Sequence, residues 1–173
     1  HLGIKPEELA RHILIVGDPG RASMIARQFF DKVEVNRFHR GLRTITGRVR
    51  ETGQRVTVTT SGMGTPSLEI VLNELMALNE INLKTRVRKR SFKPLTIIRV
   101  GTSGGLQKDT PLGTSVISTH ALGLDNTGFS YDHPADRATL RLESAARAAI
   151  RKAARGRFRS AVDVYASKAD EAV

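Results

Sequence analysis

Short apolar runs alternate with segments of helical periodicity along this chain, and that alternation limits its possible folds more than any other feature. The run HILIVG at residues 12–17 ends in the turn sequence DPG and predicts a buried strand, and apolar side chains then recur at helical spacing over residues 21–30. Residues 43–60 alternate with a period of two around a turn, which predicts a hairpin. Strands that alternate with helices, together with a hairpin, predict an α/β fold with a mixed sheet.

The rest of the chain continues this pattern. The basic segment at residues 84–93 ends at Pro94 and predicts an exposed loop. The other predicted elements are a helix that begins at Pro66, a buried strand over 95–100, a strand over 114–120, a helix over 137–155 that ends at Gly156, and the start of a strand at 161–167. We expect one domain over residues 1–173, incomplete at its C-terminus, because the chain stops soon after a predicted strand.

Composition excludes several classes of function. The chain has no cysteine, which rules out disulfides, thiolate catalysis and Cys-ligated zinc. It has neither a signal-peptide pattern nor an apolar run of membrane-spanning length, so we expect a cytoplasmic protein with no membrane partner. The net charge of +11 favours anionic partners. The basic clusters at 37–55, 84–93 and 137–159 lack interleaved aromatic residues, so we expect no nucleic acid among those partners.

Three predicted strands end in similar polar sequences, namely GDPGR, SGMGTPS and RVGTSGG. Glycines let a ligand approach the backbone, hydroxyls donate hydrogen bonds, and Arg21 and Arg99 offer the paired donors that suit phosphate. Arg99 ends an apolar strand, and a buried guanidinium needs an anion, either a carboxylate of the protein or a ligand. The set predicts an oxyanion site. A nucleotide cofactor is not expected, because Ser67 replaces the last glycine of the dinucleotide fingerprint and no P-loop lysine is present.

The motifs HLGIKPEEL, GDPGR, HRGLRTITG, TSGMGTPS and IIRVGTSGG occur here in the order seen in the nucleoside phosphorylase superfamily, and the set is most similar to the uridine phosphorylases. The resemblance runs from His1 to about His120. It implies a three-layer α/β/α fold around a mixed, partly barrel-like central sheet. It also implies an enzyme that cleaves a nucleoside, here uridine, with phosphate to give the free base and ribose 1-phosphate. Inorganic phosphate would be a co-substrate, and no cofactor is implied.

The resemblance also implies roles for individual residues. Arg21, Arg99 and Thr102 would be catalytic by positioning the reactants, and Thr102 would also face the ribose. The implied phosphate-binding residues are Gly17, Arg21, Arg40, Arg99 and Thr102, and Ser103 and Gly104 would lie near the base.

Two of the implied roles involve a neighbouring subunit. Arg40 would reach the neighbour's phosphate site, and His1 would contact the neighbour's ribose. The protein would therefore be a homodimer or a multiple of dimers with shared sites. Some relatives hold potassium at this interface with a glutamate after the matched arginine, but Gly41 stands here, so we predict no metal. The remaining histidines, His12, His39, His120 and His133, are interpreted as structural or surface residues.

The sequence leaves alternatives open. The family segments that recognise the base and the ribose hydroxyls have no counterpart before Val173. A purine nucleoside phosphorylase of the same fold and a truncated, non-catalytic phosphate-binding homologue both stay possible. A nucleosidase is disfavoured, because water as the nucleophile would give the arginines no role.

Overall fold

The computed structural model describes residues 1–132, 135–154 and 163–170, which belong to two compact units, His1–Gly104 and Gly105–Val173. The interpretation of His133 and the predicted helix stop at Gly156 lie outside the described residues. The expectation of one domain over residues 1–173 stays a prediction.

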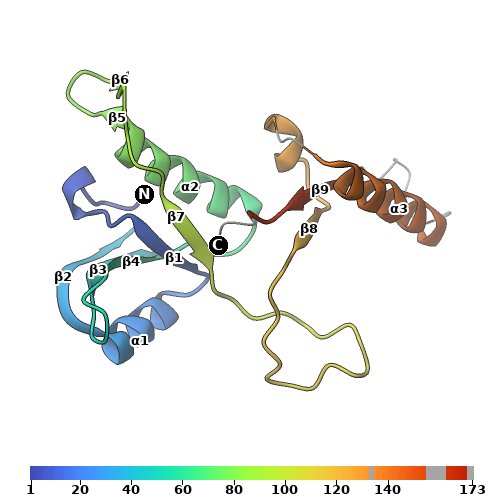
Figure 1. Cartoon of the computed structure of the whole chain (residues 1–173), viewed down its shortest axis with the longest axis horizontal. Helices are drawn as coiled ribbons and strands as arrows, with labels where there is room; N and C mark the ends of the chain where they lie inside the picture. The colour runs from blue at the N-terminus through green and yellow to red at the C-terminus, as the bar shows by residue number, and fades with distance from the viewer. Residues whose placement is uncertain (133–134, 155–162, 171–173) are drawn as a thin grey trace. The chain divides into compact units, whose positions relative to one another are not determined.

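A five-stranded mixed sheet organises the first unit (Figure 1). Its strand order is β2-β3-β4-β1-β7, with β1 parallel to both β4 and β7 and with antiparallel pairing from β2 through β4. The sheet is open among the described strands, with β2 and β7 at its edges. The elements of this unit, after a 3-10 turn at Pro6–Glu8, are β1 (His12–Val16), α1 (Pro19–Phe29), β2 (Phe30–His39), β3 (Leu42–Val49), β4 (Arg55–Thr60), α2 (Thr65–Glu80), β5 (Ile81–Asn82), β6 (Val87–Arg88) and β7 (Thr96–Arg99).

The two helices cover opposite faces of this sheet, which gives the unit three layers (Figure 1). On one face, Val71 and Leu75 of α2 pack with Ile13 and Ile15 of β1 and with Leu2 of the N-terminal segment. On the other face, a second cluster joins α1 to the hairpin strands and consists of Val16, Ala22, Ala26, Phe30, Ile45, Val56 and Val58. Burial of these apolar surfaces stabilises the layers at about 25 cal/mol per Å². The strand predicted at residues 12–17, the helix predicted at 21–30 and the hairpin predicted at 43–60 are confirmed as β1, α1 and the pair β3–β4.

Buried threonines join β3 to β4. Thr44 and Thr59 pair through their hydroxyls at 2.8 Å, and so do Thr46 and Thr57. The Thr57 hydroxyl also accepts a hydrogen bond of 2.9 Å from the backbone of Ala10, just before β1. Each of these side chains is buried, so each hydroxyl needs its partner.

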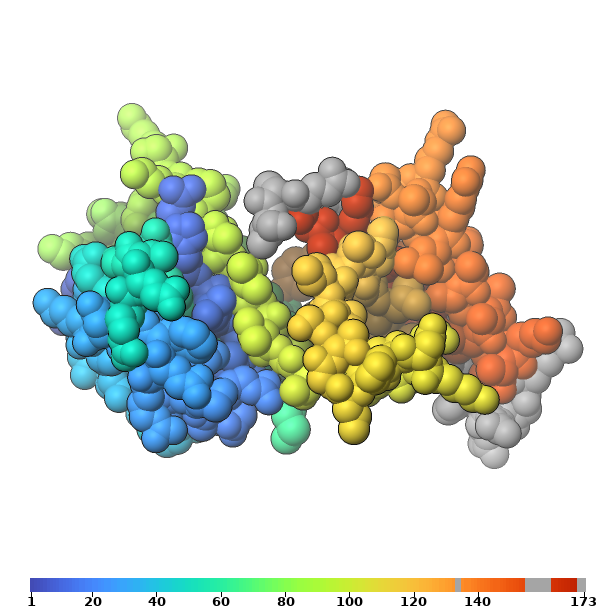
Figure 2. All heavy atoms as spheres, turned by 60° about the horizontal axis from the view of Figure 1, so that its bottom comes forward, coloured from blue at the N-terminus to red at the C-terminus, as the bar shows by residue number. Residues whose placement is uncertain are grey.

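Three sequence predictions in this unit need correction or completion. Strand β2 is missed by the sequence patterns, because its side chains are nearly all exposed and give no apolar alternation. Residues 84–93 are exposed as predicted, except for the half-buried Lys89. They do not form a plain loop, because β5 and β6 make a short antiparallel pair. The side chains of this segment project in light green in Figure 2. The predicted buried strand exists as β7, but Ile98 is 42 % exposed and Val100 is 40 % exposed. An edge strand lacks a neighbour on one side, so its side chains stay open there.

The second unit packs a helix against a two-stranded antiparallel sheet. Its elements are β8 (His120–Gly123), a 3-10 turn (Thr127–Ser130), α3 (Arg137–Ala153) and β9 (Tyr165–Lys168). The ring of Tyr165 lies over Gly123 and Gly128, where a Cβ atom would come within 2.3 Å of the ring, so both positions require glycine. Burial raises the pKa of the Tyr165 phenol, and its hydrogen bond to Asp125 acts in the same direction.

The predicted strand over residues 114–120 is wrong for all but its last residue. In the described structure residues 114–119 are exposed and belong to no strand, while β8 begins at His120. Among the described residues, β9 pairs only with residues 120–123, so the segment before them lacks a strand partner there. The helix predicted from residue 137 is confirmed as α3, and the strand start at 161–167 is confirmed within Tyr165–Lys168. No helix among the described residues is long and apolar enough to cross a membrane.

Candidate active site

The three polar sequences predicted at strand ends lie at one edge of the sheet. Because β1 pairs in parallel with both β4 and β7, the carboxyl ends of the three strands coincide, with Val16 opposite Thr60 and Ile15 opposite Arg99. Two backbone hydrogen bonds of 2.8 Å continue this pairing into the loops, from Ser61 to the Val16 carbonyl and from Val100 to the Ile15 carbonyl. This edge is where ligands gather in open α/β sheets.

The loop after β1 leads directly into the N-terminus of α1. Asp18 caps the helix, and its carboxylate accepts a hydrogen bond of 2.9 Å from the backbone of Arg21. Pro19 occupies the first turn, where its missing N–H costs no hydrogen bond. Gly17 precedes this helix terminus and Arg21 lies in its first turn; both are half-buried, and the helix dipole there favours an anion.

The loop after β4 lies against the loop after β1. A Cβ atom on Gly17 would come within 3.7 Å of the Gly62 carbonyl oxygen. Gly62 has φ +66°, and a Cβ there would come within 2.9 Å of the Ser67 hydroxyl. That hydroxyl donates a 2.5 Å hydrogen bond to the carbonyl of Ser61, so Ser67 fixes the loop. The sequence comparison with the dinucleotide fingerprint gives no indication of this structural role.

Arg99 does not lie in a buried environment, which corrects the reasoning from the sequence. Its side chain is exposed at the end of β7, and its Nη1 atom lies so close to Gly101 that a Cβ there would come within 2.8 Å of it. Within residues 1–132, 135–154 and 163–170, no carboxylate forms an ion pair with Arg21 or Arg99. An intramolecular ion pair with a described residue therefore does not explain either guanidinium.

The residues after β7 continue along the same edge without regular structure. Thr102, Ser103 and Gly104 are exposed, and they follow Arg99 directly in the first unit. Their hydroxyl and backbone groups are open to solvent. The structure thus places Gly17 and the first turn of α1, with Arg21, after β1, and it places Arg99 and Thr102 at and after the end of the paired strand β7.

Arg40 lies at the same end of the strands as Arg99, but near the opposite edge strand of the sheet, β2. Arg40 and Gly41, with φ values of 51° and 79°, form the two-residue turn between β2 and β3. Pairing of Thr44 with Thr59 places this turn beside the end of β4. Strands β4 and β1 separate β3 from β7, and three strand spacings amount to about 14 Å. Arg40 therefore lies apart from Arg99 within one chain.

His1 lies next to this turn. The carbonyl oxygen of His1 accepts a hydrogen bond of 3.0 Å from Nδ1 of His39, the residue before Arg40. On its other side, His1 contacts Glu74 of α2. The two residues for which a role in a neighbouring subunit is predicted, His1 and Arg40, thus share one corner of the first unit. The sequence does not indicate this proximity.

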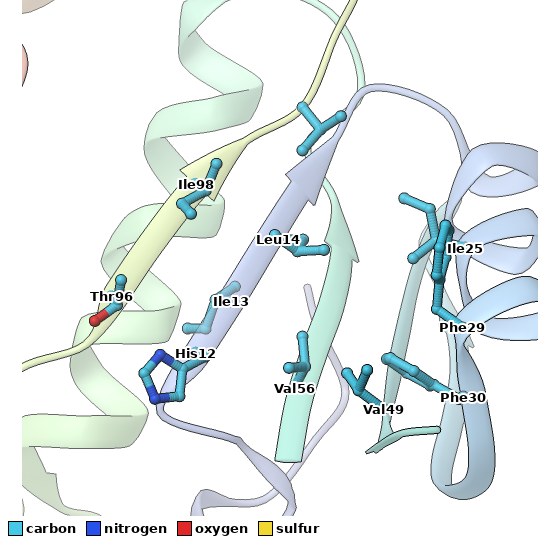
Figure 3. A pocket seen from close by; sticks show the side chains of 11 residues that line it. His12, Ile13, Leu14, Ile25, Phe29, Phe30, Val49, Val56, Thr96 and Ile98 are labelled. Carbon is cyan, nitrogen blue, oxygen red and sulfur yellow. The ribbon is translucent and has the colours of Figure 1, made fainter. Parts of the chain in front are cut away.

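A hollow of about 420 Å³ lies on the sheet face beside α1. Figure 3 shows Ile25 and Phe29 of α1 on one side of it and Ile98 of β7 on the other, with α2 behind the sheet. Its lining is almost entirely apolar, with Leu14, Val56 and Val100 among the contributing side chains. Such a surface does not suit phosphate, so the candidate site stays at the strand ends.

The other histidines are distributed over the described structure. His12 and His120 are half-buried, whereas His39 is exposed and contacts His1. The interpretation of His12 and His120 as structural residues agrees with their places at the starts of β1 and β8. His39 is a surface residue, and its hydrogen bond to the carbonyl of His1 holds the N-terminal segment.

Comparison with known proteins then decides the family. The sequence profile described as "Phosphorylase superfamily" matches residues 11–170, which is nearly the whole chain. The chain belongs to the phosphorylase superfamily. This match extends beyond His120, where the resemblance in motifs ends.

Two curated relatives in the phosphorylase superfamily show how the chain compares in length. It is 36% identical over 121 residues to a DeoD-type purine nucleoside phosphorylase of Roseobacter denitrificans, covering 70% of this chain and 45% of that protein. It is 33% identical over 131 residues to a uridine phosphorylase of Thermococcus kodakarensis, covering 76% of this chain and 41% of that protein. The aligned region therefore spans less than half the length of either relative.

A solved structure of a phosphorylase superfamily member supports the fold. The chain is 31% identical to the nucleoside phosphorylase of Trypanosoma brucei, with a TM-score of 0.80. That protein is described as having uridine phosphorylase activity. The match covers 99% of this chain and 55% of that one. The predicted mixed α/β fold of the family is confirmed.

Proposed function

We propose that this chain provides the phosphate-binding part of a nucleoside phosphorylase. In the reaction a phosphate oxygen forms a bond to the anomeric carbon of the ribose while the bond from that carbon to the base breaks. The electron pair of the broken bond leaves with the base, and the base takes up the proton that the hydrogen phosphate ion loses. The products are the free base and ribose 1-phosphate. Because the chain spans about half of its relatives' length, this activity is proposed for the protein of which the chain is the whole or a part.

One observation carries the proposal. Arg21 lies in the first turn of α1, shortly after β1, and Arg99 ends β7, the strand parallel to β1. Neither guanidinium has a carboxylate partner among the described residues. A divalent phosphate would supply the missing negative charge and accept bidentate hydrogen bonds. Gly17 and Thr102 would add donors at the same edge. A fixed phosphate needs no covalent help from the protein, because positioning and charge stabilisation lower the barrier.

We propose uridine as the nucleoside, with Thr102 facing the ribose and with Ser103 and Gly104 near the base. The Trypanosoma brucei structure supports uridine, since uridine phosphorylase activity is shown by that protein. Purine nucleosides are the second candidate, because several curated relatives that are 36–39% identical are purine nucleoside phosphorylases. Phosphate-dependent release of base from uridine and from inosine, measured side by side, distinguishes the two.

We propose that the sites are shared between two copies of the chain. Arg40 is exposed at a turn about three strand spacings from Arg99, and His1 lies at the same corner, so both can serve a neighbour without serving their own site. A C2 dimer that joins such corners would complete two sites at once. The protein would then be a homodimer or a multiple of dimers.

Calorimetric titration with inorganic phosphate tests the site. Replacing Arg99 by Ala should weaken phosphate binding about tenfold or more, because hydrogen bonds to charged groups contribute about 1.5–3 kcal/mol. Replacing Arg90, which is exposed in the segment after β6, is the matched control and should leave binding unchanged. Equal effects at Arg99 and Arg90 would contradict the phosphate site. Phosphate binding without any base release would favour the non-catalytic alternative.

A further inference from the structure

Glu74 organises the N-terminal end of the chain around one carboxylate. The backbone nitrogen of His1 lies 2.7 Å from both oxygens of Glu74, and the backbone N–H of Leu2 donates to Oε2 at 2.9 Å. Nδ1 of the His1 ring lies 2.5 Å from Oε1. The sequence separates these residues by 73 positions, so only the fold brings them together.

The surroundings hold this cluster in place. Leu2 is only 2 % exposed and packs in the apolar cluster with Val71 and Leu75, the neighbours of Glu74 on α2. On the far side, His39 donates from Nδ1 to the carbonyl of His1 at 3.0 Å. The side chains of His1 and Glu74 are each about one third exposed, 33% and 32%, so the imidazole is anchored but still accessible.

The carboxylate also determines which ring nitrogen of His1 carries the proton. An ionised carboxylate only accepts hydrogen bonds, so Nδ1 must be the donor. In the neutral imidazole the other nitrogen, Nε2, then keeps its lone pair and acts as an acceptor. Within the described part of the chain, no residue forms a hydrogen bond with Nε2 of His1.

We propose that Glu74 is the positioning residue for His1, and that it holds the imidazole as the Nδ1–H tautomer so that Nε2 accepts a hydrogen bond from a ribose hydroxyl bound by a neighbouring copy. This inference rests on the proposed function for its ligand. The arrangement itself, a carboxylate that orients a histidine through one nitrogen while the other contacts the ligand, is the way in which many sites fix a ring's orientation. Glu74 acts through His1 and does not touch the substrate.

The tautomer can be measured directly by ¹⁵N NMR of the His1 ring at a pH above the titration of the imidazole. The wild-type protein should show a protonated Nδ1 and a bare Nε2. Glu74→Gln should keep this pattern, because the amide oxygen still accepts from Nδ1–H. Glu74→Ala should lose it, whereas Glu80→Ala should not, because Glu80 lies on the same helix and pairs instead with Arg88.

An Nε2–H tautomer in the wild-type protein, or an unchanged spectrum in Glu74→Ala, would overturn the proposal. If Glu74→Ala fails to fold, the wild-type tautomer and the Glu74→Gln spectrum still decide the question. A second measurement separates this inference from the proposed function. Uridine and inosine are titrated into the protein while the His1 Nε2 resonance is followed, and Glu74→Ala should weaken nucleoside binding about tenfold without changing phosphate binding.

The two measurements can disagree, and each disagreement has a defined meaning. Nucleoside binding that leaves Nε2 unaffected would overturn the ligand contact proposed for His1. The absence of any nucleoside binding by the wild-type protein would count against the proposed function, while the tautomer would still report on Glu74 as the positioning residue. Equal loss of nucleoside binding in Glu74→Ala and Glu80→Ala would indicate a general effect on α2 and would overturn the specific role.

Discussion

The buried threonine pairs between β3 and β4 allow a quantitative prediction about stability. Thr57 bonds both to Thr46 and to the backbone of Ala10, so Thr57→Val leaves two buried groups without partners. Thr46→Val removes only one of the two hydrogen bonds of Thr57, because the Thr57 hydroxyl still accepts from Ala10. A buried polar group without a partner costs about 1–3 kcal/mol, so Thr57→Val should lower the free energy of unfolding by roughly 2–6 kcal/mol and Thr46→Val by about half as much. Valine keeps the side-chain shape, so cavity formation adds little.

The second pair serves as an internal control. Thr44 and Thr59 bond to each other, so the double change to valine removes both groups together and should cost less than the sum of the two single changes. The double change at Thr46 and Thr57 should regain less stability relative to its two single changes, because the N–H of Ala10 stays unpaired. Urea unfolding followed by far-UV circular dichroism measures each value, with equal m-values as the condition for comparison. Equal costs for Thr57→Val and Thr46→Val would refute this reasoning.

Three further predictions concern the loop after β4, the start of α3 and the core. Gly62→Ala should weaken phosphate binding and lower the melting temperature, because φ is +66° there and the new Cβ would lie 2.9 Å from the Ser67 hydroxyl. An unchanged phosphate affinity and an unchanged melting temperature in calorimetry would contradict this prediction. Hydrogen bonds from the Thr139 backbone and side chain lower the pKa of Asp136 from 3.8 to about 2, so its cap contribution is fully present above pH 4 and lost as pH falls toward 2. Circular dichroism of Asp136→Asn should show a smaller loss of helix over this pH range than the wild-type protein does. Leu75→Ala should cost about 2–5 kcal/mol in urea unfolding, since Leu75 is fully buried, and a cost below 1 kcal/mol would show that the cluster under α2 is loosely packed.

Local sequence patterns determine much of the first unit. The run at 12–17 and the hairpin at 43–60 are predictable because apolar side chains recur with the period of the structure they form. The N-terminus of α1 is predictable because Asp18 and Pro19 supply a cap and a pre-set backbone angle. The sequence also predicts that the three glycine-rich loops lie together, because each loop follows a strand and the carboxyl ends of parallel strands lie at one edge of the sheet.

Tertiary structure decides what depends on partners distant in sequence. Burial of Arg99 could not be predicted correctly, because burial depends on what lies beside the strand, and β7 proves to be an edge of the described sheet. Strand β2 carries no apolar alternation, so its pairing with β3, more than its own side chains, defines it as a strand. The contact of Glu74 with His1 spans 73 positions and joins a helix to the N-terminal segment. A side chain's neighbours in the fold decide its burial and its hydrogen bonds, and for these residues the neighbours come from distant parts of the sequence.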